Sequence, residues 1–186
     1  MRRVLLLVGL LSLSGCATPL EVASITEIKP HTGSKSIDVY EPKRLTGETS
    51  VPEFAGDQLV EVRTYVHQED KGEVEISGAA CSLTASDFSA SAQSPAKIRV
   101  PLYRGQSSAL AVACEKPGYK RRLVTVEAID TTRQGRLASG AGGGLIGVVA
   151  VAAIDAMADN SKNDWRYPVA RIVLEPEENA AVAGSR

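Results

Sequence analysis

Short segments that alternate apolar and polar residues run through the middle of the chain, and they constrain its fold more than any other feature. The clearest is LVEVRTYV, Leu59–Val66. Strands have this period of two because successive side chains point to opposite faces of a sheet. Similar segments follow it: EVEIS, ACSLTA, AKIRVPLY, SALAVACE, KRRLVTVEAI and, near the C-terminus, ARIVLEP.

Turn-forming residues separate these segments at short intervals, in the clusters EDKG, SDFSASAQSP, RGQ and KPG. Six or seven short strands with such turns are typical of an antiparallel β-sandwich. Only 4% of the residues are aromatic, so small aliphatic side chains must fill the core. We therefore predict a mainly β fold, an antiparallel β-sandwich over residues 58–176, with a disordered tail at 177–186.

The N-terminus has the pattern of an export signal. Arg2 and Arg3 precede an apolar run of about ten residues, which suits a signal peptide and is too short for a membrane-spanning helix. The segment ends in Leu13-Ser14-Gly15-Cys16, which resembles the bacterial lipobox. That resemblance implies that residues 1–15 are a lipoprotein signal peptide and that Cys16 carries the lipid. Ala17 replaces the aspartate that retains many such proteins at the inner membrane, which favours the outer membrane.

Residues 16–57 are rich in Thr, Ser, Pro, Glu and Lys and contain only isolated apolar residues, so we expect a flexible tether, in which Ile37–Tyr40 could form one docked strand. Removal of residues 1–15 leaves 19 basic against 22 acidic side chains. A weakly acidic protein has no electrostatic footprint for nucleic acid, so no nucleic-acid partner is expected.

Two cysteines, Cys81 and Cys114, remain once Cys16 is assigned to lipid. Both lie in strand-like segments of a chain expected to be exported, where an even number of cysteines favours a disulfide. Two buried free thiols and a catalytic thiol are the alternatives. Neither His31 nor His67 has an evident relation to either cysteine.

A glycine-rich apolar run lies near the C-terminus, and no residue from Leu137 to Ile154 is charged. It is long enough for a poor membrane span, and Gly142–Gly147 matches the dinucleotide-binding pattern G-x-G-x-x-G without the strand that must precede it. We favour a helical insertion at about 140–159, before the last strand. Gly143 and Gly147 lie four residues apart on that helix and would allow close backbone packing.

Several further motifs belong to one pattern: Gly78-Ala79-Ala80-Cys81, Pro95, Cys114-Glu115-Lys116-Pro117-Gly118-Tyr119, Gly143-Gly144-Leu145-Ile146-Gly147, Asp155-Ala156 and Tyr167-Pro168. Together they resemble the PEGA-type and carboxypeptidase-regulatory-like sandwich domains of proteobacterial envelope lipoproteins. The resemblance covers residues 58–175 and departs after Ala156, where MADNSKNDW replaces a shorter link. It implies a β-sandwich in the bacterial envelope and no established reaction.

No enzymatic site is expected. Ser94-Pro95-Ala96-Lys97 matches the S-x-x-K nucleophile motif, but Pro95 leads into a strand and the companion motifs are missing. His31 and His67 cannot assemble a metal site, and no cofactor is predicted. Lys116, Lys120, Arg121 and Arg122 form a small basic patch near Tyr119 that could meet an anionic glycan or lipid headgroup, although a solvated strand face is the simpler reading.

We therefore predict a lipid-anchored, non-enzymatic binding or structural module on the periplasmic side of the outer membrane. Its expected partners are membrane lipid, through acylated Cys16, and an envelope protein or glycan. The alternative is a self-associating or membrane-active protein that uses the glycine-rich helix 143–158.

Overall fold

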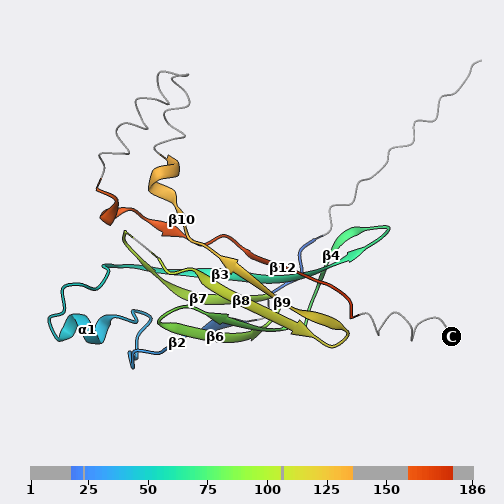
Figure 1. The fold of residues 1–186 in the computed structure, drawn as a ribbon, viewed down its shortest axis with the longest axis horizontal. Coiled ribbons are helices and arrows are strands. Elements are labelled where there is room, and N and C mark those ends of the chain that lie inside the picture. Colours follow the sequence, from blue (N-terminus) through green and yellow to red (C-terminus); the bar gives the residue numbers. More distant parts are fainter. Residues whose placement is uncertain (1–17, 23, 106, 136–158, 178–186) are drawn as a thin grey trace, which may run out of the picture.

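The computed structural model describes residues 18–22, 24–105, 107–135 and 159–177, and these form a mainly β protein. Two five-stranded sheets pack face to face (Figure 1). A small third sheet pairs β10 (Ile129–Asp130) with β11 (Trp165–Arg166) beyond one end of the sandwich. The predicted fold class is therefore confirmed.

The first sheet, sheet A, is built around one long strand. Its order is β1 (Ile25–Glu27), β7 (Ala96–Tyr103), β3 (Phe54–Gln68) and β12 (Ala170–Leu174), and β4 (Gly72–Ile76) also pairs with β3. The β3–β7 and β3–β4 pairs are antiparallel, but β1 pairs with β7 and β12 pairs with β3 in parallel. The sandwich is thus not wholly antiparallel. Both parallel pairs join strands far apart in the chain, as parallel pairing requires.

The second sheet, sheet B, is entirely antiparallel, with the order β2 (Lys29–Pro30), β6 (Phe88–Gln93), β5 (Ala80–Thr84), β8 (Leu110–Lys116) and β9 (Tyr119–Val126). Strand β6 occupies the segment that we predicted to be a turn. Phe88 and Ala90 are buried, whereas Ser91 is exposed. The alternation is present, but small serines and alanines conceal it.

Aliphatic side chains from the inner faces of both sheets form the core. The largest fully buried apolar side chains are Leu83, Ile98, Leu110, Ile172, Leu174, Val39, Val60, Val62, Val100 and Val112. One polar contact crosses this interior: the hydroxyls of Thr64, in β3, and Ser94, just after β6, lie 2.6 Å apart. Burial of a hydroxyl is tolerated because each has a hydrogen-bond partner.

The predicted tether at 16–57 is wrong for much of its length. Its residues supply β1, β2, the helix α1 (Glu41–Leu45) and the first residues of β3, and the side chain of Val39 is fully buried. The isolated apolar residues of this segment, Ile28, Ile37 and Val39 among them, pack on the core instead of remaining in solvent. The folded unit therefore begins well before residue 58.

The predicted helical insertion at 140–159, with Gly143 and Gly147, lies almost wholly outside the described residues. The chain is described again from Asp159, and a 3-10 helix, η1 (Asn160–Lys162), leads into β11 and β12. Within the described ranges, no helix has the length and apolar character needed to cross a membrane.

Candidate functional site

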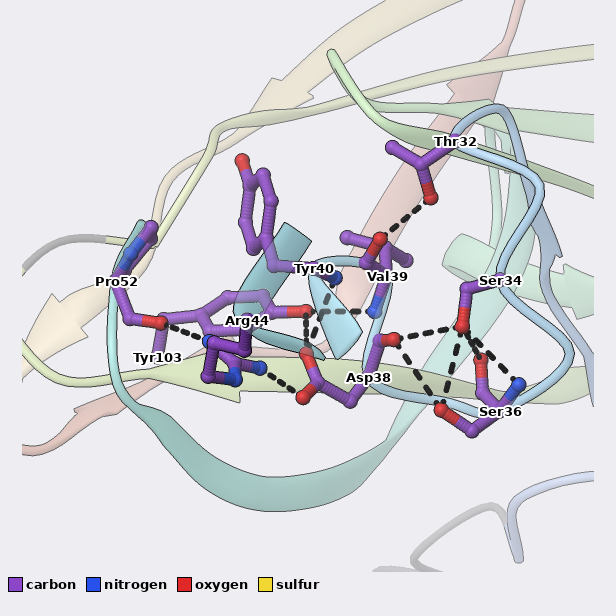
Figure 2. A network of polar contacts seen from close by, with 9 residues as sticks. All are labelled: Thr32, Ser34, Ser36, Asp38, Val39, Tyr40, Arg44, Pro52 and Tyr103. Carbon is purple, nitrogen blue, oxygen red and sulfur yellow. Dashed lines mark hydrogen bonds and ion pairs between the residues drawn. The ribbon is translucent and has the colours of Figure 1, made fainter. Parts of the chain in front are cut away.

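An extensive polar cluster surrounds Asp38, where the N-terminal segment packs against β7 (Figure 2). Asp38 pairs through Oδ2 with the guanidinium of Arg44, and its Oδ1 accepts hydrogen bonds from the Tyr103 hydroxyl at 3.1 Å and the Tyr40 amide at 3.1 Å. The Tyr103 hydroxyl in turn accepts the Val39 amide at 3.0 Å. We call these five residues the Asp38 network.

Further contacts hold the same segment from both sides. Arg44 donates to the carbonyl of Pro52 at 2.6 Å, and Ser34 donates to the carbonyl of Asp38 at 2.8 Å. Tyr40 donates to Asp87 at 2.6 Å, and its ring meets that of Tyr103 edge to face, with the centroids 5.0 Å apart. Both Asp38 carboxylate oxygens accept hydrogen bonds within the chain, so this network fixes the N-terminal segment against β7.

The two cysteines are joined as predicted. Cys81 and Cys114 face each other in the β5–β8 register, with their Cα atoms 4.1 Å apart, and form a disulfide. Both side chains are buried in the core. The buried-thiol and catalytic-thiol alternatives are therefore excluded for this structure.

A shallow groove of about 450 Å³ lies on sheet B, over the strands that carry the disulfide. Its lining includes Ala80, Cys81, Ser82, Ser91, Gln93, Ala113, Glu115 and Arg121. A second hollow of about 360 Å³ shares Ala80, Glu115 and Arg121 with it and adds Lys116, Pro117 and Tyr119, together with Gly78 and Glu177. We call the two together the sheet B groove.

The strand pattern explains the shape of this groove. On β5, β6 and β8 the residues that do not face the core are mostly alanine and serine, so the floor carries no large side chain. The rim carries Gln93, Glu115 and Arg121, all exposed. The Gln93 amide can donate and accept hydrogen bonds, the Glu115 carboxylate can accept them, and the Arg121 guanidinium can donate them. The groove therefore suits a polar ligand that lies along the sheet.

The structure divides the basic patch noted in the sequence. Lys116 and Arg121 line the sheet B groove beside Tyr119, whereas Arg122 lies 3.7 Å from Glu175 and does not line it. Lys120 is also absent from its lining. The basic patch can be recognised in the sequence, but the small-residue floor beside it cannot, because that floor depends on strand pairing.

The structure also places the other residues that the sequence singled out. Ser94 is buried against Thr64, while Lys97 lies 3.6 Å from Glu61 on sheet A, so the S-x-x-K match brings no nucleophile to a base. In the part of the chain that the structure describes, no group of three His, Cys, Asp or Glu residues could hold a metal ion. Cys16, Gly143 and Gly147 lie outside the described residues.

Replacement of Tyr103 by phenylalanine tests the role of the Asp38 network. Tyr103→Phe removes one buried and one partly buried hydrogen bond and should lower the free energy of unfolding by about 1–3 kcal/mol at neutral pH. Burial raises the pKa of Tyr103 from 10.0 to about 12. The neutral phenol is thus favoured in the folded state, and its contribution is complete below pH 10 and lost as the pH rises toward 12.

Denaturant unfolding at neutral pH and near pH 11 measures both effects. Wild type should lose more stability over this interval than Tyr103→Phe, and Tyr119→Phe, at the rim of the sheet B groove, serves as the matched control. Equal alkaline losses in wild type and Tyr103→Phe would contradict the assignment.

Comparison of the chain with protein-family models, with curated proteins and with solved structures finds no match in any of the three. The resemblance to PEGA-type lipoprotein domains therefore stays a prediction, and the function must be argued from the geometry of the chain itself.

Proposed function

We propose that this chain is a lipid-anchored protein of the bacterial envelope, a non-enzymatic binding module on the periplasmic side of the outer membrane. The observation that carries the binding role is the sheet B groove, which joins a small-residue floor to a rim of Gln93, Glu115 and Arg121. The lipobox-like Leu13-Ser14-Gly15-Cys16 supports the anchor. A disulfide between Cys81 and Cys114 is compatible with an oxidising compartment outside the cytoplasm.

The groove favours a glycan of the envelope as its ligand. Its open, shallow form suits a chain that lies across the strands better than a small molecule that must be enclosed. Sugar hydroxyls can bond to Gln93 and Glu115, and a sugar carboxylate can pair with Arg121, whose guanidinium fits such a group with two parallel hydrogen bonds. The ring of Tyr119, at the end of the groove, offers an apolar face for the sugar ring.

Replacement of Cys16 tests the anchor. Cys16→Ser removes the sulfur that would carry the lipid, so we expect loss of labelling by a palmitate analogue and accumulation of the unprocessed precursor in cells. Ser14→Ala, which keeps a small residue before the cysteine, is the control and should still be labelled. Equal labelling of Cys16→Ser and wild type would refute lipidation at this residue.

Replacement of Arg121 tests the groove. Arg121→Ala should weaken co-sedimentation of the protein with purified cell-wall glycan by about tenfold, since loss of a charged hydrogen-bonding partner costs roughly 1.5–3 kcal/mol. Arg122→Ala is the matched control because the neighbouring side chain does not line the groove. Unchanged sedimentation of Arg121→Ala, or an equal loss in Arg122→Ala, would contradict glycan binding at this site. Recovery of a bound protein instead of glycan would identify a protein partner and overturn the glycan assignment.

A further inference from the structure

The first described residues of the chain are held against the outer face of sheet A. The amide of Leu20 donates to Glu75 at 2.9 Å, and the guanidinium of Arg63 donates to the carbonyl of Leu20 at 3.1 Å. Arg63 and Glu75 also pair with each other at 2.6 Å, and their side chains are only 13% and 11% exposed. We call these three residues the Leu20 clamp. Figure 1 shows the first described residues of the chain beside β4, which carries Glu75.

The clamp leaves little chain between the domain and the proposed lipid. Cys16 precedes Leu20 by four residues. A fully extended chain spans at most about 3.6 Å per residue, so this connection can reach no further than about 14 Å. Acyl chains on Cys16 would therefore keep the clamped face of sheet A close to the lipid headgroups.

We propose that the outer face of sheet A rests on the phospholipid surface that holds the acyl chains of Cys16. This orientation rests on the proposed lipid anchor. It turns the sheet B groove, on the opposite side of the sandwich, toward the periplasm.

Exposed apolar side chains are scattered over the face proposed to meet the lipid. Leu20, Ile25, Leu59 and Val169 are 39%, 49%, 36% and 51% exposed. Leu59 alternates with the buried Val60 and so faces outward from β3, and Ile25 stands in register with Lys97 on the same face. Val169 lines a hollow of about 480 Å³ together with Arg63. Isolated exposed apolar residues need no explanation, but several on one face at the end of a lipid anchor favour contact with a lipid surface.

The charged side chains of this face are paired with one another. Arg99 pairs with Glu27 and Asp57, and Lys97 pairs with Glu61. Beside them, Arg171 pairs with Glu73 and stacks on the ring of Tyr65, with 3.7 Å between the guanidinium carbon and the ring centroid. Paired charges leave no strong net field on the face. It can therefore approach headgroups that carry both signs, such as phosphatidylethanolamine, without net repulsion.

Fluorescence quenching on vesicles tests the orientation. The acylated full chain is reconstituted into vesicles of phosphatidylethanolamine and phosphatidylglycerol, with one environment-sensitive label at Leu59→Cys or at Leu123→Cys. Leu123 is the matched control, because it is a 60% exposed leucine in β9 of the opposite sheet. The proposed lipid and the disulfide occupy all three native cysteines, so the introduced thiol is the one to be labelled.

A headgroup-attached nitroxide should quench the label at position 59 several-fold more than the label at position 123, and aqueous iodide should show the reverse preference. Equal quenching at the two positions, or stronger lipid quenching at 123, would overturn the orientation. The double variant Arg63→Gln with Glu75→Gln releases the clamp and should reduce the difference in lipid quenching between positions 59 and 123. This variant should still bind the vesicles and float with them. Circular dichroism establishes that this double variant keeps the fold.

Flotation separates failure of the orientation from failure of the anchor. Wild type should float with the vesicles, and Cys16→Ser should remain with the soluble fraction. Flotation without a quenching preference would overturn the orientation alone. Wild type that does not float would overturn the lipid anchor and the orientation that rests on it.

Discussion

The pairing of β3 on both of its edges is the constraint on which the rest of the structure depends. This strand runs for 15 residues, pairs with β7 and then β4 along one edge, and pairs with β12 along the other. One set of its alternating side chains, including Val60 and Val62, enters the core. The other set includes Leu59 and Arg63 on the outer face. A register slip of one residue would exchange the two sets and lose both the core and the Leu20 clamp.

The two faces of the sandwich follow from this alternation and suit different partners. Sheet A presents paired charges and scattered apolar side chains, together with the clamp on the N-terminal segment. Sheet B presents a floor of small residues with Gln93, Glu115 and Arg121 at its rim. In the function proposed here, the first face meets lipid and the second meets an envelope glycan. The buried disulfide joins the central strands beneath the groove and so supports its floor.

The period of two in the sequence predicted the strands whose apolar and polar residues alternate clearly. It could not predict contacts between residues that lie far apart in the chain. β3 and β7 were predicted because valine and isoleucine mark their buried faces. β6 was missed because its outward residues are two serines and Gln93, and its inward residues after Phe88 are alanines. The cysteine count predicted the disulfide. The Leu20 clamp could not be foreseen, because Glu75 lies 55 residues from Leu20 and only the folded sheet brings the two together.

The separation between the folded domain and the bilayer tests this arrangement most directly. Neutron reflectometry of the acylated protein on a planar phospholipid bilayer measures where protein density begins above the headgroups. If the Leu20 clamp holds, density will begin within about 14 Å of the headgroups, the reach of four extended residues. A wider layer of water between the bilayer and the domain would show that the N-terminal segment acts as a long tether and would contradict the proposed contact of sheet A with lipid.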